Sequence, residues 1–195
     1  MRINQLLAAR GIHYLVTKLG SPKLRSLAFD EKYRQGHWRH SDSVDELVAI
    51  IHRYLRGGDL LIMGCGGASV LESVELQDLK SALGIDLSQE AIRLASRFAS
   101  DKVSFQLADM VTFECPHPYD LILFSESLYY VPVASQESLL RRLAAHLKPG
   151  GVFLVTFAQA KRYKNMINGI RRNFAVIEDR TFSGSTRHLI VFNSR

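Results

Sequence analysis

Three closely spaced glycines follow an apolar run in the stretch LLIMGCGGAS, residues 60–69. Gly64, Gly66 and Gly67 have no β-carbon, so a bound molecule can approach the backbone there and positive φ angles cost little. A buried parallel strand that ends in such glycines, with a helix expected next, is typical of proteins that hold a nucleotide-like cofactor. The stretch therefore predicts a cofactor-binding loop.

Two acidic residues end the next two apolar runs, where they could bind the remainder of such a cofactor. Asp86 ends KSALGID and lies 22 residues after Gly64 (86 − 64 = 22), close to the roughly 20 residues between the glycines and the ribose-binding acid in nucleotide-binding units. Its carboxylate can accept hydrogen bonds from both ribose hydroxyls. Asp109 follows KVSFQLA, and it would reach an adenine amino group while the Met110 amide donates to a ring nitrogen.

Apolar periodicity places these residues in a framework of alternating strands and helices. Strands are expected at 60–63, 80–87, 102–108, 119–126 and 151–158. Helices are expected at 43–56, 69–76, 89–100, 135–147 and 160–171, the first capped by Asp42 or Ser43 and the third by Ser88. Two further strands, 173–182 and 186–194, are joined by a short loop and form an antiparallel hairpin at the sheet edge. We predict an α/β, Rossmann-like doubly wound sheet of seven strands, mostly parallel with an antiparallel C-terminal hairpin strand.

The charge of the chain is unevenly distributed. The 195 residues carry a formal net charge of +6, yet residues 58–157 hold 12 acidic against 7 basic side chains. A cationic cofactor suits this middle segment better than a phosphate-rich one, although charges solvated on outer helices are the alternative. Two cysteines are too few for a disulfide framework, which favours the cytoplasm. The first twenty residues read as an amphipathic helix interrupted by charges, so we expect no membrane span.

Four stretches, in this order, resemble motifs of the class I S-adenosyl-L-methionine (SAM) dependent methyltransferases, over about residues 42–193. They are LIMGCGGAS, GIDLS, LADM, and YDLILFSESLYYV followed by LKPGGVFLVTF. The resemblance implies SAM as cofactor and S-adenosyl-L-homocysteine (SAH) as product. The cofactor-binding positions it implies are Gly64, Cys65, Gly66, Asp86, Leu87, Asp109, Met110 and Ser125. The sequence departs from the family at Ile62, where an acid is usual, and at Ala68, where a third glycine is frequent.

The segment before the first predicted helix of this region, FDEKYRQGHWRHSDS, resembles the cofactor-covering stretch of small-molecule methyltransferases. Tyr33 and Trp38 are the candidates to close over SAM, while the alternative is an aromatic pair that anchors the N-terminus on the core. We expect residues 1–41 to form an N-terminal helix and this covering segment. Residues 42–195 would form the SAM-binding methyltransferase domain, the whole being one globular domain.

Candidates for acid-base chemistry and for acceptor binding lie just after the fourth strand and in the leading segment FDEKYRQGHWRHSDS. Glu126 and His37 could act as the catalytic base that an oxygen or nitrogen acceptor requires. Tyr129, Tyr130 and His40 could bind the substrate. An ordinary loop carboxylate, surface histidines and core tyrosines are the alternatives. No cluster of His, Cys or Asp has metal-ligand spacing, so we expect no metal.

The acceptor is the least determined part of this prediction. The loop SESLYYV resembles that of nodulation N-methyltransferases, which act on chitooligosaccharides, and so favours a small, sugar-like acceptor methylated on oxygen or nitrogen. An RNA or nucleotide methyltransferase is the alternative, because basic residues would cluster on one helix and its exit. They are Lys161, Arg162, Lys164, Arg171 and Arg172. A noncatalytic SAM-binding protein is a further alternative. An NAD enzyme is disfavoured because Ser69 stands where G-x-G-x-x-G has its last glycine. The oligomeric state is left open.

Overall fold

The computed structural model describes residues 15–17, 20–37, 45–75 and 79–195. Within those ranges no helix combines the length and the apolar character needed to cross a membrane. Residues 15–17 are helical, and the remainder of the predicted N-terminal helix lies outside the described residues. So does the proposed boundary between residues 41 and 42, together with the predicted caps Asp42 and Ser43.

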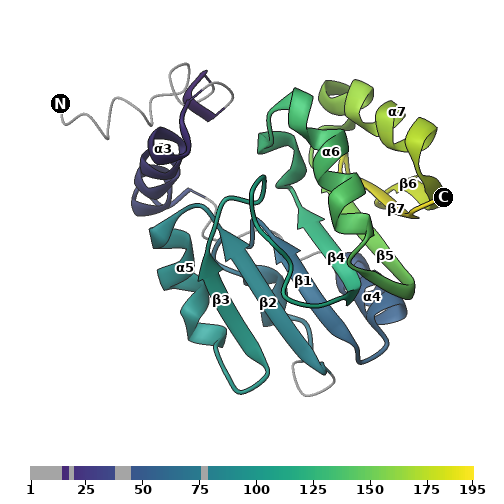
Figure 1. The fold of residues 1–195 in the computed structure, drawn as a ribbon, viewed down its shortest axis with the longest axis horizontal. Helices are drawn as coiled ribbons and strands as arrows, with labels where there is room; N and C mark the ends of the chain where they lie inside the picture. Colours follow the sequence, from purple (N-terminus) through teal and green to yellow (C-terminus); the bar gives the residue numbers. More distant parts are fainter. Residues whose placement is uncertain (1–14, 18–19, 38–44, 76–78) are drawn as a thin grey trace.

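The described strands form one seven-stranded sheet in the order β3-β2-β1-β4-β5-β7-β6 (Figure 1). The strands are β1 (Asp59–Met63), β2 (Ser81–Asp86), β3 (Val103–Leu107), β4 (Tyr119–Ser125), β5 (Leu147–Phe157), β6 (Ala175–Thr181) and β7 (His188–Asn193). Strands β1 to β5 pair in parallel with one another. Strand β7 pairs antiparallel with both β5 and β6. This confirms the predicted mostly parallel sheet with its antiparallel C-terminal hairpin.

Apolar side chains cover both faces of this sheet, as the continuous apolar strands predict. In β1, Leu60 and Ile62 join a core with helix α4 (Asp45–Leu55), while Leu61 and Met63 join a second core. Helices α6 (Val133–Ala144) and α7 (Lys164–Asn173) build that second core. A strand that is buried on both faces needs no polar alternation, which is why β1 reads as a short apolar run.

The helices agree with the sequence in position and differ at their ends. Helix α5 (Gln89–Ala95) begins at the predicted cap, where the Ser88 hydroxyl accepts from the Ala91 amide at 3.1 Å, and it continues as a 3₁₀ turn over Ser96–Phe98. The predicted helix 160–171 begins as a 3₁₀ turn, Ala160–Tyr163, before α7. The predicted helix 69–76 is wrong in extent: the structure has a single 3₁₀ turn, Ser69–Glu72, which no side chain caps.

The sequence Lys148-Pro149-Gly150-Gly151 directly follows the predicted helix 135–147 and is typical of a helix end, but in the structure it belongs to a strand. Helix α6 ends at Ala144, and β5 pairs with β4 from Leu147 onwards. The register shifts between Tyr119 and Leu121, and Gly150 has a φ of 79°. The proline and glycines therefore form a bulge in the strand. In a sequence, the same residue types also indicate a turn.

A helix that the sequence analysis did not predict lies before the sheet. Helix α3 (Pro22–Arg34) begins with Ser21 as its cap and Pro22 in its first turn. It lies at the end of the sheet toward which the strand arrows point (Figure 1). It thus partly covers the edge at which the cofactor-binding residues were predicted.

Asp59 holds together the opposite end of the sheet and does not replace the missing acid at Ile62. Its carboxylate accepts from the Ser81 hydroxyl at 2.7 Å and from the ammonium groups of Lys80 and Lys148. Burial raises the pKa of Asp59, but the hydrogen bonds from Lys148, Ser81 and Lys80 outweigh it and lower the pKa to about 2.

Replacing Asp59 with asparagine is expected to lower the free energy of unfolding by about 2 kcal/mol at neutral pH, because charged hydrogen bonds are lost. A lowered carboxyl pKa contributes stability above about pH 4, and the contribution is lost as the pH falls toward 2. Urea unfolding at several pH values measures this effect, with the exposed Asp101→Asn as control. An unchanged midpoint for Asp59→Asn at neutral pH would contradict it.

Candidate active site

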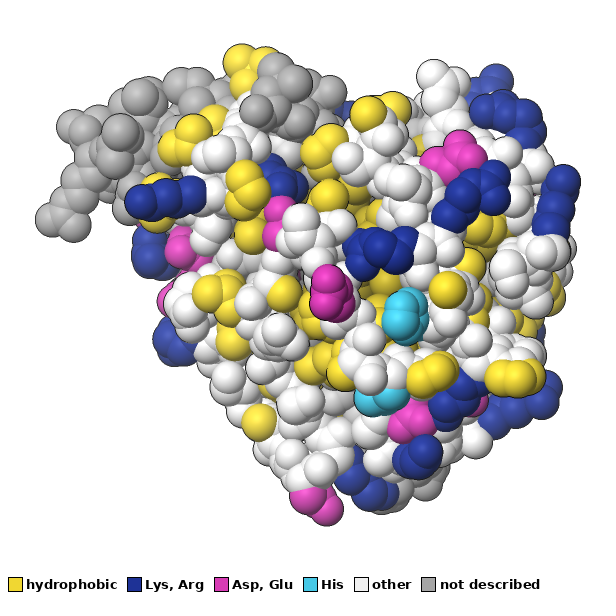
Figure 2. All heavy atoms as spheres, viewed as in Figure 1, with side chains coloured by type: hydrophobic (Ala, Val, Ile, Leu, Met, Phe, Trp, Pro, Cys, Tyr) yellow, Lys and Arg dark blue, Asp and Glu magenta, His cyan; other side chains and the backbone are white. Residues whose placement is uncertain are grey.

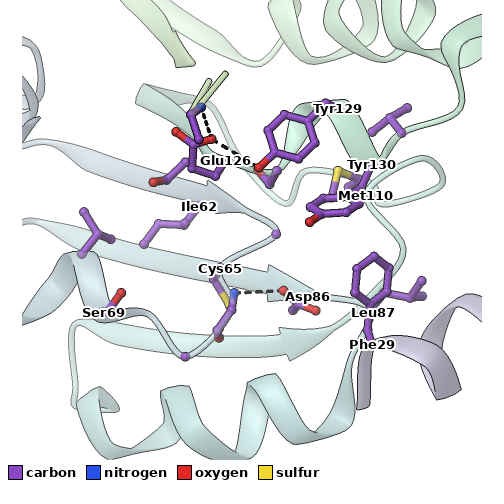
Figure 3. Close-up of a pocket in the computed structure, with 18 of the residues that line it drawn as sticks. Phe29, Ile62, Cys65, Ser69, Asp86, Leu87, Met110, Glu126, Tyr129 and Tyr130 are labelled. Atoms are coloured by element: carbon purple, nitrogen blue, oxygen red, sulfur yellow. Dashed lines mark hydrogen bonds between the residues drawn. The ribbon is translucent and has the colours of Figure 1, made fainter. Parts of the chain in front are cut away.

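A cavity of about 370 Å³ opens at the carboxyl ends of the central strands, between the glycine loop and α3. Figure 3 shows Cys65, Asp86 and Met110 around it, with Glu126 and Tyr129 on the side of β4. Twelve predicted site residues line the cavity: Tyr33, Gly64, Cys65, Gly66, Asp86, Leu87, Asp109, Met110, Ser125, Glu126, Tyr129 and Tyr130. The fold therefore brings together most of the residues that the sequence analysis singled out.

The glycine loop needs its glycines for conformation and for space. Gly64 and Gly66 have φ angles of 70° and 56°, which residues other than glycine rarely adopt. A β-carbon on Gly64 would lie 2.7 Å from Cβ of Ser127, and one on Gly66 would lie 2.7 Å from the Tyr33 hydroxyl oxygen. The amide of Cys65 donates to the Ile85 carbonyl at 2.8 Å, which ties the loop to β2. The loop is thus a preformed, closely packed cavity wall.

Asp86 is held by backbone amides at the end of β2. One oxygen accepts from the Gly66 amide at 2.9 Å, and the other accepts from the Ser88 amide at 2.8 Å. Burial raises the pKa of Asp86 to about 6, and the amide hydrogen bonds from Ser88, Gly66 and Leu87 only partly oppose it. Each carboxylate oxygen has a second lone pair, so Asp86 can still accept from a ligand's hydroxyl groups.

Helix α3 is fixed over the cavity by a buried carboxylate. The Ser88 hydroxyl donates to Asp30 at 2.6 Å, and the Glu90 amide donates to the same oxygen at 3.1 Å. Asp30 therefore caps the first turn of α5 from another helix. From the same helix Tyr33, which is buried, reaches the glycine loop, and burial raises the pKa of its hydroxyl. Tyr33 thus lies where a residue that covers a cofactor was predicted.

A second contact of α3 reaches the acid at the end of β3. The guanidinium of Arg25 forms an ion pair with Asp109, and both side chains are about one-tenth exposed. The other Asp109 oxygen accepts from the Val111 amide at 3.0 Å. Asp109 lines the cavity as predicted, but its charge is paired within the protein. It can therefore orient a hydrogen-bonding group of the ligand without presenting an unpaired negative charge to it.

Aromatic rings form the wall of the cavity beyond β4. The rings of Tyr129 and Tyr163 stack with centroids 4.3 Å apart, and Tyr129 and Tyr130 lie 4.8 Å apart. Phe29 of α3 meets Tyr130 edge-on at 5.2 Å. Burial raises the pKa of Tyr130 to about 12 and that of Tyr129 further. Both tyrosines therefore stay neutral at physiological pH and present flat, partly apolar surfaces.

Glu126 follows β4 with a left-handed backbone, φ 55°. Its amide donates to the Thr156 hydroxyl at 3.1 Å, and its Oε2 accepts from the Tyr129 hydroxyl and from the Ala158 amide. The side chain is thereby aimed into the cavity between β4 and β5. A carboxylate in this place can act as a base or can bind a cation.

The structure does not place the histidines or the tryptophan of the covering segment at the cavity. His37 follows α3, is exposed, and is not among the residues that line the cavity, so its role as a base stays a prediction. Trp38 and His40 lie outside the described residues. Across the part of the chain that the structure describes, no three His, Cys, Asp or Glu residues are grouped as a metal site would require.

Several lining residues were missed by sequence reasoning. The most informative are Arg25 and Phe29 of α3, and Arg187, which precedes β7. Ser21 followed by Pro22 is a helix-start signal that could have indicated α3. Nothing local marks Arg187, because only the pairing of β7 with β5 brings it to the cavity.

The comparisons with known proteins agree with this geometry. Residues 60–151, which include the glycine loop, both acids and Glu126, match the family model described as a methyltransferase domain. Curated relatives include a ubiquinone biosynthesis O-methyltransferase of Nitrosospira multiformis, 34% identical over 111 residues, which are 54% of this chain and 45% of that protein. Another, of Chromobacterium violaceum, is 32% identical over 120 residues, 57% of this chain and 50% of that protein. The chain spans about half the length of the curated relatives it matches.

Solved structures of methyltransferases share the fold. The N-methyltransferase NodS of Bradyrhizobium japonicum WM9, in complex with SAH, superposes with a TM-score of 0.65 at 19% identity, over 87% of this chain and 95% of that one. The glycopeptide N-methyltransferase MtfA, complexed with SAM, gives 0.65 at 14% identity over 81% and 96%. The predicted fold of a class I SAM-dependent methyltransferase is confirmed.

Proposed function

We propose that the protein is a SAM-dependent methyltransferase that methylates an oxygen or a nitrogen of a small molecule. The observation that carries the proposal is the cavity at the carboxyl ends of β1, β2 and β4, which joins a glycine loop, a ribose-type acid and an aromatic wall. Ligands of open α/β sheets bind at this edge. The curated relatives are O-methyltransferases and the structural neighbours include N-methyltransferases, which supports both kinds of acceptor atom.

The residues present fit SAM. Gly64 and Gly66 line the cavity with backbone that carries no β-carbon, Asp86 has acceptor capacity for the ribose hydroxyls, and Asp109 with Met110 would face the adenine. When bound, SAM supplies an activated methyl group for in-line displacement, with SAH as product. The chain's own part is to orient the acceptor and to exclude water, and orientation alone can account for roughly 7 to 11 kcal/mol of a bimolecular barrier.

The aromatic wall supports a small acceptor. Tyr129 and Tyr130 stand between the cofactor cavity and a larger, more open cavity of about 950 Å³ between α6 and α7. An acceptor bound there would lie against rings that are neutral at physiological pH, which suits a flat or sugar-like molecule. The tyrosine faces would also stabilise the sulfonium cation. A cytoplasmic location stays a prediction.

Two other functions remain as alternatives. On the face shown in Figure 2 basic side chains occur in several separate groups. Within the segment predicted to bind RNA, Arg171 pairs with Asp179 at 2.6 Å and Arg162 lies over the Tyr163 ring. These contacts favour a small molecule over RNA. A noncatalytic SAM-binding protein would share the cavity and would differ only in turnover.

A methyl-transfer assay tests the proposal. Protein is incubated with SAM that carries a labelled methyl group and with pools of sugars, amines, phenols and mixed RNA. Label transferred to a small-molecule pool supports it. Transfer to RNA alone, with affinity that falls steeply with salt, would favour the alternative. SAM binding without transfer to any pool would favour the noncatalytic protein.

SAM affinity is expected to fall as the pH is lowered through about 6, the pKa to which burial raises Asp86. Ribose hydroxyls donate to the ionised carboxylate, so binding below this pKa must first release a proton, and affinity falls toward about tenfold per pH unit. For the stability of the unliganded protein, the effect of pH is the opposite. The raised pKa of Asp86 contributes to the free energy of unfolding below about pH 4, and this contribution is lost as the pH rises through 6. Titration calorimetry between about pH 5 and about pH 8 measures the affinity. A profile that stays flat for the native protein, as expected only for Asp86→Asn, would contradict this role.

A further inference from the structure

One buried oxygen at the cavity lacks a hydrogen bond. Oε2 of Glu126 accepts from Tyr129 and Ala158, but Oε1 is inaccessible to solvent and, among the described residues, receives no hydrogen bond. A buried acceptor left in this state costs about 1 to 3 kcal/mol, and more when it is charged. The left-handed φ of Glu126 adds about 1 to 2 kcal/mol. Strain and an unused acceptor at one cavity residue indicate a ligand that donates hydrogen bonds.

The side chain of Arg187 forms an ion pair with this oxygen. Its Nε lies 3.4 Å from Glu126 Oε1, an ion pair without hydrogen-bond geometry, and both residues line the cavity. The hairpin that carries Arg187 is fixed to the same place, because the Thr186 hydroxyl donates to the Ala158 carbonyl at 3.1 Å. A carboxylate and a guanidinium of opposite charge thus lie side by side at the cavity, and the carboxylate oxygen Oε1 keeps an unused acceptor.

The pair of Glu126 and Arg187 lies near the position in β1 where an expected acid is missing. Ile62 is buried and occupies the position before the glycine loop where the resemblance leads one to expect an acid for the ammonium end of SAM. Ile62 pairs with Leu123 of the neighbouring strand, so the end of β4 carries Glu126 to the same edge of the sheet. In Figure 3, Ile62 and Glu126 lie toward one end of the view, and Phe29 and Leu87 lie toward the other.

We propose that Glu126 and Arg187 bind the amino-acid end of SAM, with Glu126 accepting from the α-ammonium and Arg187 donating to the α-carboxylate. The negative charge is then supplied by β4 in place of β1. Each member of the weak ion pair gains a partner of opposite charge on the ligand, and charge-assisted hydrogen bonds of this kind are the stronger ones. The inference rests on the proposed function and assigns Glu126 to the cofactor, in place of the base predicted from the sequence.

Binding of three ligands to single variants tests the assignment. SAH carries both the ammonium and the carboxylate, decarboxylated SAM carries the ammonium only, and 5′-methylthioadenosine carries neither. Glu126→Gln should weaken SAH and decarboxylated SAM by about ten- to hundredfold and leave 5′-methylthioadenosine within about twofold. Arg187→Gln should weaken SAH alone. Glutamine keeps the acceptor for the Ala158 amide, so the fold should persist, and thermal unfolding checks this.

The exposed pair of helix α6 supplies a control, because Glu137→Gln removes a charge that Arg141 holds at the surface and should change none of the three affinities. Equal losses for all three ligands in Glu126→Gln would mean a structural role and would overturn the inference. Unchanged SAH binding in both variants would overturn it as well. If the native protein binds neither SAM nor SAH, the proposed function itself is wrong, which the first titration reveals separately.

Discussion

Replacing Gly64 with valine is expected to abolish SAM binding, with a loss of more than about hundredfold. A side chain at a φ of 70° costs about 1 to 2 kcal/mol, and its β-carbon would lie 2.7 Å from Ser127 and 3.1 Å from the Met110 side chain. The loop must shift to relieve this contact. The shift would displace the backbone against which the adenine and ribose of SAM would be positioned. Titration calorimetry with SAM measures the effect.

Gly184→Val provides a matched control for backbone strain. Gly184 has a similar φ of 66°, but a β-carbon there would meet nothing within 4 Å, and the residue lies in the hairpin turn away from the lining of the cavity. This variant should bind SAM like the native protein while losing some stability. A folded Gly64→Val protein that binds SAM normally would refute the role of the loop.

Replacing Asp86 with alanine is expected to weaken SAM binding by about 1 to 3 kcal/mol, or roughly ten- to hundredfold. The ribose hydroxyls lose a charged acceptor, and the Gly66 amide loses its partner at 2.9 Å, so the glycine loop is also less fixed. Calorimetry with SAM and with SAH measures both ligands.

The exposed Asp101→Ala serves as control for the loss of one negative charge and should leave both affinities unchanged. If Asp86→Ala protein is folded and binds SAM with native affinity, the cofactor site lies elsewhere. A loss confined to SAM and absent for SAH would also be unexpected, because the two ligands share the ribose.

The succession of strands along the chain and most of the cofactor side could be predicted because the information is local. Gly64, Asp86 and Asp109 lie at or just after the carboxyl ends of β1, β2 and β3, and parallel strands bring these ends to one edge of the sheet. The aromatic pair Tyr129 and Tyr130 follows β4 in the same way. These residues therefore meet whatever the precise ends of the helices are.

The covering helix and the basic residue opposite Glu126 depend on contacts between distant parts of the chain. Arg25 and Asp30 are buried charged residues on α3, which obscures the apolar periodicity by which a helix is recognised. Their partners, Asp109 and Ser88, lie far along the chain. Arg187 reaches the cavity only through the antiparallel pairing of β7, so single-residue signals could not reveal it.

Titration calorimetry of the native protein with SAM and, separately, with NAD tests the central claim most directly, on protein checked for cofactor retained from expression. We predict micromolar binding of SAM and of SAH, and no heat of binding with NAD. Binding of NAD in place of SAM, or of neither ligand, would contradict the assignment of this cavity to SAM.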